Sequence, residues 1–137
     1  MSSEINLALV GASGVVGKKI ISLLEKKNVK VKNFYPLGSS SVGDKISFND
    51  QIFEIESLSN FDCTSADIAI FSAGSSVARD HAPDFVKKGV YVVDLSSEFR
   101  YEEDIPLIIP EINPQALIDA DGPILIANPN CSVSQLL

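Results

Sequence analysis

The fold is decided by the stretch INLALVGASGVVG, residues Ile5–Gly17. Its first part, Ile5–Val10, is almost entirely apolar, as expected for a buried strand of a parallel sheet. Glycines then recur at every third position, and across Val16–Lys27 the apolar residues follow a helical spacing, with lysines on the other face. The stretch therefore predicts a strand, a tight turn and a helix.

Gly11, Gly14 and Gly17 make this turn a candidate phosphate site. Glycines permit a tight strand-to-helix turn and a close approach of the main chain to a pyrophosphate, and the helix N-terminus offers unpaired N–H groups to that anion. Because the spacing is not G-x-G-x-x-G, a packing role alone is the alternative. The position between a strand and a helix favours the dinucleotide site.

The rest of the chain repeats this alternation, which predicts an α/β fold: a Rossmann-like, doubly wound, mostly parallel sheet with helices on both faces. Pro36 is expected to turn the end of the second strand into a loop, and Pro83 to kink its helix or delay the start. Further strands are predicted at Val31–Leu37, Ile68–Phe71, Val90–Asp94, Leu107–Ile109 and Ile124–Ala127, a hairpin around Ile46–Ile55, and further helices at Ser76–Lys88 and from Pro114 to Ala120.

Composition excludes several classes of protein. The 137 residues correspond to one ordinary domain, and 45% hydrophobic with 21% charged residues are unlike disordered or collagen-like chains. No apolar run approaches the ~20 residues of a membrane-spanning helix, and the start lacks the basic region of a signal peptide. The net charge of −7 argues against nucleic acids and anionic membranes. Two cysteines cannot form a disulfide framework, so we expect a reducing cytoplasm.

The loop after the second strand bears on the choice of cofactor. NAD-binding domains usually place an acid about 20 residues after the glycine turn, to hold the ribose 2′-hydroxyl. Here the stretch is Pro36–Ser41, and the first acid is Asp44. Hydroxyls without a carboxylate tolerate a 2′-phosphate, which favours NADP; a plain serine-rich loop is the alternative.

Cys131 is the candidate nucleophile, in the motif Asn128–Ser132 between the last strand and a terminal helix. A thiol at a helix N-terminus has a lowered pKa, so its thiolate can attack an acyl or aldehyde carbon. A buried structural cysteine is the alternative. Cys63 lacks such a setting and is interpreted as a bystander, and His81 as a solvated surface residue.

Asp94–Arg100 follows a strand directly, where ligands bind in doubly wound sheets. Arg100 is suited to grip a phosphate or carboxylate through two hydrogen bonds. An ion pair with Glu98, Glu102 or Glu103 is an equal alternative.

Together these motifs resemble the N-terminal part of aspartate-semialdehyde dehydrogenases. The cysteine motif fits this family better than its sister family, the N-acetyl-glutamyl-phosphate reductases, whose motif resembles N-P-G-C-Y. The matching segments run along almost the whole chain: Gly11–Gly17, Leu37–Ser40, Ser72–Gly74, Ala82–Pro83, Val93–Arg100, Pro110–Asn113 and Asn128–Ser132.

The resemblance implies NADPH-dependent reductive dephosphorylation of 4-phospho-L-aspartate to L-aspartate 4-semialdehyde, with no metal. Cys131 would attack the acyl phosphate, while Asn130 and Arg100 would hold the phosphate group. The implied cofactor contacts are Gly11, Ser13, Gly14 and Val15 at the pyrophosphate, Ser39 and Ser40 near the 2′-phosphate, and Ala73 and Gly74 at the nicotinamide ribose.

Two departures from the family pattern matter. Ser41 stands where the family commonly carries an arginine, which weakens the expected grip on the 2′-phosphate. The family also continues into a second α+β domain with the acid–base histidine and most of a homodimer interface. We therefore expect residues 1–130 to form the cofactor domain, residues 131–137 to begin the second, and the chain alone to be inactive. A reductase of the sister family and a non-catalytic dinucleotide-binding module are the alternatives.

Overall fold

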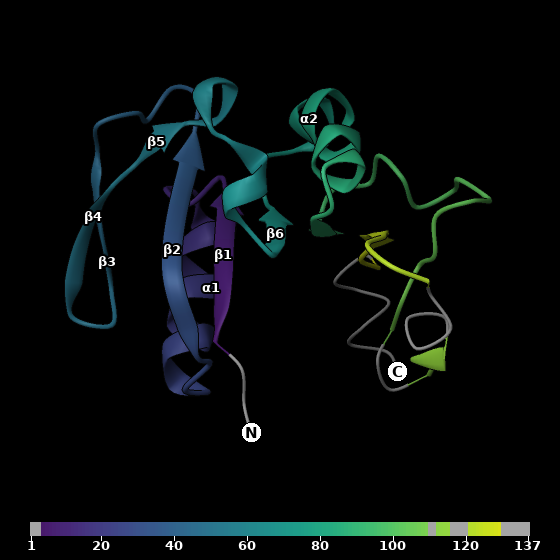
Figure 1. Ribbon diagram of the computed structural model, residues 1–137, viewed down its shortest axis with the longest axis horizontal. Helices are drawn as coiled ribbons and strands as arrows, with labels where there is room; N and C mark the ends of the chain where they lie inside the picture. Colours follow the sequence, from purple (N-terminus) through teal and green to yellow (C-terminus); the bar gives the residue numbers. More distant parts are fainter. Residues whose placement is uncertain (1–3, 110–111, 116–120, 130–137) are drawn as a thin grey trace.

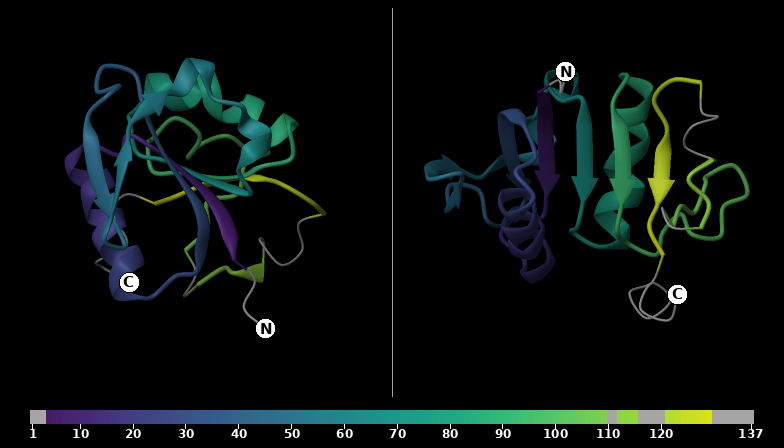
Figure 2. Two further views of the ribbon diagram at one scale, coloured as in Figure 1. Left: turned by 60° about the vertical axis from the view of Figure 1, so that its left-hand side comes forward. Right: turned by 90° about the horizontal axis from the view of Figure 1, so that it is seen from below.

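A computed structural model describes residues 4–109, 112–115 and 121–129. Six strands of the described residues form one parallel sheet in the order β5-β2-β1-β6-β7-β8 (Figures 1 and 2). The sheet strands are β1 Ile5–Val10, β2 Val31–Gly38, β5 Glu56–Ser57, β6 Ile68–Phe71, β7 Tyr91–Asp94 and β8 Leu125–Ala127. The other elements are helices α1 Val15–Lys26 and α2 Ser75–Lys87, a hairpin of β3 Lys45–Phe48 and β4 Gln51–Glu54, and 3-10 turns η1 Leu58–Asn60 and η2 Cys63–Ser65.

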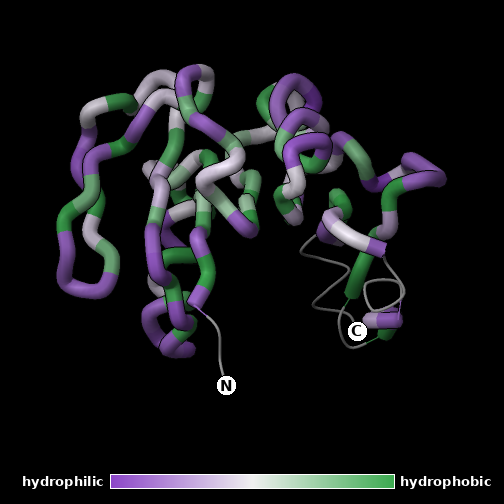
Figure 3. The backbone as a smooth tube through the Cα atoms, in the orientation of Figure 1, coloured by the Kyte–Doolittle hydropathy of each residue, from purple (hydrophilic) through white to green (hydrophobic). Residues whose placement is uncertain are grey.

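The two helices cover opposite faces of the sheet. Alternate residues of β1 point to opposite sides. Leu7 and Leu9 therefore pack with Ile21 of α1, whereas Ala8 and Val10 share a second buried cluster with Phe85 of α2. Hydrophobic segments lie in the strands, while the hairpin tip and the end of α1 are hydrophilic (Figure 3). The predicted doubly wound α/β architecture is confirmed.

The β3–β4 hairpin stands at the side of the sheet beyond β2 (Figure 1). It packs on β2 through aromatic rings: the ring centroid of Phe34 in β2 lies 4.6 Å from that of Phe48 and 5.3 Å from that of Phe53. Its tip is held by the Asn49 N–H, which donates to the Glu25 carboxylate of α1 at 2.9 Å. The hairpin predicted around Ile46–Ile55 is confirmed.

Prolines account for two corrections. The second strand, predicted at Val31–Leu37 with its far end turned toward a loop by Pro36, instead continues through Pro36 to Gly38. The Leu37 carbonyl accepts a hydrogen bond from the Gly11 N–H of the neighbouring chain segment at 2.9 Å. Since successive residues of a strand point their main-chain groups to opposite edges, the Pro36 nitrogen points to the outer edge. There β5 pairs only with Leu37 and Gly38, so no N–H is needed at Pro36. Nor does Pro83 delay α2, which begins at Ser75, one residue before the predicted start.

One predicted strand is absent from the structure, one short strand was not predicted, and two predicted helices fall at least partly outside the described residues. Leu107–Ile109 is not a strand, because only Leu107 forms a bridge, with Ala127 at the end of β8. The two-residue strand β5 was not predicted, since no hydrophobic period can identify so short an element. The helix predicted from Pro114 to Ala120 and the terminal helix after Cys131 extend outside the described residues. In the part of the chain that is described, no helix is long and apolar enough to cross a membrane.

Candidate dinucleotide-binding site

The strand order reverses between β1 and β6: β2 and β5 follow on one side, and β7 and β8 on the other. Ligands of doubly wound sheets bind outside the carboxyl ends of the strands at such a reversal. The loops at this edge contain almost all the residues singled out in the sequence. They are Gly11–Gly14 after β1, Ser39–Ser41 after β2, Ser72–Gly74 after β6, Leu95–Arg100 after β7 and Asn128–Pro129 after β8.

Gly11 and Gly17 are required by packing. Gly11 has φ +85°, and a Cβ there would stand 2.8 Å from the Ser72 carbonyl oxygen. A Cβ on Gly17 would collide with the carbonyl oxygen of Gly11, so α1 can lie against the turn only through glycine. These two residues thus explain the tight strand–turn–helix geometry without any ligand.

Gly14 is different, because the protein itself does not need a glycine there. Its backbone is extended (φ −73°, ψ 170°), and an added Cβ would meet only the Gly11 carbonyl oxygen, at an ordinary 3.5 Å. Gly14 is also the N-cap of α1 and supplies no side chain to satisfy the first N–H groups of the helix. The open space at Gly14, next to the unpaired N–H groups at the start of α1, is suited to bind the negatively charged pyrophosphate of a dinucleotide. Val15 beside it is an apolar side chain that is 88% exposed.

The loop after β6 forms a second open helix start opposite the first. The Ser72 hydroxyl donates to the Val10 carbonyl at 2.8 Å and so ties this loop to the end of β1. Gly74 caps α2 with φ +94° and no side-chain hydrogen bond, and nothing lies within 4 Å of where its Cβ would be. Ala73 and Gly74 are exposed at the point where the strand order reverses.

The serine loop after β2 is closed by main-chain hydrogen bonds. The Asp44 N–H donates to the Ser41 carbonyl at 3.0 Å, and the Gly43 N–H to the Ile55 carbonyl at 2.9 Å. The Ser41 hydroxyl lies against Gly38, 2.6 Å from where a Cβ would stand, so it faces inward. Ser39 and Ser40 are exposed, which leaves their hydroxyls available to a ligand.

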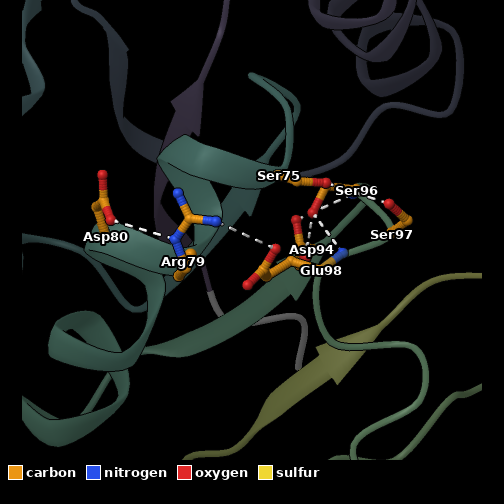
Figure 4. A network of polar contacts seen from close by, with 7 residues as sticks. All are labelled: Ser75, Arg79, Asp80, Asp94, Ser96, Ser97 and Glu98. Atoms are coloured by element: carbon orange, nitrogen blue, oxygen red, sulfur yellow. Dashed lines mark hydrogen bonds and ion pairs between the residues drawn. The ribbon is translucent and has the colours of Figure 1, made fainter.

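Asp94 organises the loop after β7 (Figure 4). Its buried carboxylate accepts from the Ser96 N–H at 3.0 Å and from the Ser96 hydroxyl at 2.7 Å. Two contacts join the same loop to α2: the Ser75 and Ser97 hydroxyls lie 3.2 Å apart, and Arg79 pairs with Glu98 at 3.9 Å. The loop is therefore fixed against the N-terminal half of α2.

Arg100 joins the ends of β7 and β8. Its Nε donates to the Asn128 carbonyl at 2.8 Å, and its Nη2 to the Leu95 carbonyl at 3.2 Å. The Asn128 N–H in turn donates to the Asp94 carbonyl at 2.9 Å. No ion pair of Arg100 occurs among the described residues, and Glu98 pairs with Arg79 instead, so the alternative of an ion pair with Glu98, Glu102 or Glu103 is wrong. These hydrogen bonds of Arg100, here called the Arg100 clamp, could not be predicted from the sequence. Their acceptors are main-chain carbonyls, which every residue has.

Comparison with known proteins identifies the domain. The family described as "Semialdehyde dehydrogenase, NAD binding domain" matches residues 6–120. The chain belongs to this family. As a semialdehyde dehydrogenase NAD-binding domain, it binds a nicotinamide dinucleotide, in agreement with the two open helix starts at the crevice.

The relatives of this domain are aspartate-semialdehyde dehydrogenases, as the resemblance predicted. Those of Shewanella violacea and Legionella pneumophila are 46% and 44% identical over the whole chain. The solved structure of aspartate semialdehyde dehydrogenase II from Vibrio cholerae, complexed with ASA, matches 98% of the chain with 38% identity and a TM-score of 0.93. That of the Candida albicans enzyme with NADP is 24% identical with a TM-score of 0.76, and supports the fold alone.

The chain spans about two fifths of the length of these relatives: 41% of the Shewanella violacea protein, 40% of the Legionella pneumophila protein and 44% of the Vibrio cholerae chain. Asn130 and Cys131 lie outside the described residues, directly after Asn128 and Pro129. Their roles stay predictions.

The remaining candidates of the sequence lie away from this edge. The Cys63 thiol is buried in the core beneath α2, and burial raises its pKa, so it stays protonated, as suits a bystander. His81, predicted at the surface, is half-buried on α2. No group of three or more possible metal-ligating side chains occurs within residues 4–109, 112–115 and 121–129.

Proposed function

We propose that this chain is the NADP-binding, nucleophile-bearing part of an aspartate-semialdehyde dehydrogenase, which reduces 4-phospho-L-aspartate to L-aspartate 4-semialdehyde. The observation that carries the proposal is the pair of uncapped helix starts, Gly14 and Gly74, on either side of the point where the strand order reverses. The proposal places the longer protein in the cytoplasm as a homodimer.

In this proposal the cofactor lies across the carboxyl edge of the sheet. Gly11, Ser13, Gly14 and Val15 hold its pyrophosphate at the N-terminus of α1, where the helix dipole favours an anion. Ser39 and Ser40 donate hydroxyl hydrogen bonds to the 2′-phosphate, since both side chains are exposed to solvent. Ala73 and Gly74 lie along the nicotinamide ribose. When bound, the reduced cofactor supplies a hydride to the acyl carbon.

The substrate is held at the ends of β7 and β8. The Cys131 thiolate attacks the acyl carbon of 4-phospho-L-aspartate, a C–S bond forms, the C–O bond to phosphate breaks, and inorganic phosphate leaves. After hydride addition to the thioester carbon, the C–S bond breaks, which releases L-aspartate 4-semialdehyde and restores the thiolate. Arg100 and Asn130 bind that phosphate. Arg100 is suited to this because Nε and Nη2 are already fixed on main-chain carbonyls, so the guanidinium reaches the phosphate in one orientation.

The cofactor proposal is tested by titrating the chain with NADPH and NADH, as wild type and as Gly14→Ala. We expect binding by the wild type, tighter for NADPH, and a loss of at least about tenfold in Gly14→Ala, because the new methyl group occupies the pyrophosphate position. Lys19→Ala, on the exposed surface of α1, is the matched control and binds normally. Undiminished binding by Gly14→Ala would contradict the proposal.

The substrate proposal is tested on the longer protein to which the chain corresponds. Turnover of L-aspartate 4-semialdehyde with phosphate and NADP, abolished by Cys131→Ala, is expected. Preference for the N-acetyl-glutamate semialdehyde would instead indicate a reductase of the sister family. If Cys131 is alkylated no faster than free cysteine near neutral pH, the chain is a non-catalytic binding module.

A further inference from the structure

The shortest strand of the sheet brings a carboxylate to the serine loop. In β5, Glu56 pairs with Leu37 and Ser57 with Gly38, the last two residues of β2. Paired strands lie about 4.8 Å apart, so Glu56 is a direct neighbour of the main chain that continues into Ser39 and Ser40. In the sequence Glu56 is far from this loop, and only the sheet pairing reveals the contact.

A cavity of about 480 Å³ opens at the same place. Val42 and Gly43 from the end of the serine loop, Glu56 from β5 and Phe61 after η1 line it, and its size is that of a small-ligand site. The cavity therefore adjoins the loop to which we assign the 2′-phosphate, and Glu56 forms part of its wall.

The charge of Glu56 is not balanced locally. The segment Gly38–Asp44 contains no lysine or arginine, and Ser41 occupies the position where a basic residue was expected. Glu54, which also lines the cavity, stands opposite Lys45 across the hairpin. Glu56 has no such partner in register, is exposed, and makes no ion pair among the described residues.

We infer that Glu56 is a specificity-determining residue whose carboxylate opposes the 2′-phosphate and thereby narrows the preference for NADPH over NADH. The inference rests on the proposed function, since it takes the dinucleotide to lie along the serine loop. The 2′-phosphate carries close to two negative charges at neutral pH, whereas the 2′-hydroxyl of NADH carries none. A nearby carboxylate therefore weakens the binding of NADPH but not that of NADH. This repulsion opposes the hydrogen bonds that Ser39 and Ser40 donate to the 2′-phosphate.

The experiment compares the dissociation constants of NADPH and NADH for the wild-type chain and Glu56→Gln, which keeps the size of the side chain. At low ionic strength we expect NADPH to bind about threefold tighter to Glu56→Gln while NADH binding is unchanged, because only the 2′-phosphate of NADPH is relieved of Coulomb repulsion through solvent. In about 1 M salt, where the screening length is only about 3 Å, the gain in NADPH affinity disappears.

Asp50→Asn is the matched control, because it removes the same charge at the hairpin tip, at the far end of β4 from the cavity, in a positive-φ position that asparagine tolerates. Both affinities should stay at wild-type values. An unchanged NADPH to NADH ratio in Glu56→Gln, or a gain that persists in high salt, overturns the role of Glu56. Failure of the wild-type chain to bind either nucleotide overturns the proposed function, and the inference with it.

Discussion

The two helices that begin at the crevice start in different ways. The α1 turn is crowded, because a side chain on Gly11 would meet the main chain of Ser72 and one on Gly17 would meet that of Gly11. The α2 turn is open, because nothing lies near the missing side chain of Gly74, and only its φ of +94° calls for glycine. Glycine thus serves close packing in the α1 turn, together with a positive φ at Gly11, and backbone conformation alone in the α2 turn. At Gly14 it serves neither, which is why we assign that residue to the ligand.

Among the three glycine substitutions, Gly17→Ala should reduce the stability of the protein most. Its methyl group would collide with the Gly11 carbonyl and the Ala12 main chain, which are backbone atoms and cannot rotate away. We expect a loss of about 3 kcal/mol or more in the free energy of unfolding, measured in urea. Lys19→Ala, exposed two residues later in α1, should change it by less than about 0.5 kcal/mol. A Gly17→Ala protein as stable as Lys19→Ala would contradict the packing role.

Gly74→Ala should have an intermediate effect, because it introduces backbone strain without a collision. With φ +94° and ψ 173° the residue lies in a region that side chains rarely adopt, so we expect a cost of about 2 kcal/mol in the free energy of unfolding. Gly89→Ala, also at positive φ (+90°) and in open space, tests strain alone in the same way. A much larger loss for Gly74→Ala would mean that the α2 turn is packed like the α1 turn.

Gly14→Ala should have the smallest effect on stability. Its extended backbone suits any residue, so the entropy lost from the unfolded chain and the poorer N-cap nearly cancel, within about 0.5 kcal/mol. Denaturation of the same preparation used for cofactor titration measures this value. If Gly14→Ala loses cofactor binding but keeps normal stability, Gly14 contacts the ligand and has no packing role. If the variant loses stability as well as binding, Gly14 is required for packing, as Gly17 is.

Local patterns were sufficient to predict most of the sheet. The strand–turn–helix at Ile5–Lys26 and the strands around Ile68 and Tyr91 follow from apolar runs and helical spacing, which depend on neighbouring residues. The end of β2 was misjudged because the tolerance for Pro36 depends on which edge its nitrogen faces, and that is set by the partner strand.

The candidate site was predicted less completely than the fold. The glycine turn and serine loop lie where the sequence suggested, at the carboxyl edge. The Arg100 clamp on Asn128 and the approach of Glu56 to the serine loop are contacts between distant segments. No spacing rule records such contacts, because they depend on the order of strands in the sheet. The placement of Cys131 stays a prediction.

Pro36 has a further consequence, for association between chains. β5 pairs with β2 only at Leu37 and Gly38, and the β3–β4 hairpin packs against Phe34, so the exposed part of this edge is Lys32 and Asn33. An exposed edge can template pairing with the strand of another molecule. Pro36 cannot donate a hydrogen bond there, and the exposed Lys32 adds a charge that a second strand would have to bury. At the other edge, the Ile108 N–H donates to the Ala127 carbonyl at 3.1 Å and partly covers β8. The proline that β2 tolerates before the serine loop therefore also removes one hydrogen-bond donor from the strand edge, which disfavours aggregation through this edge.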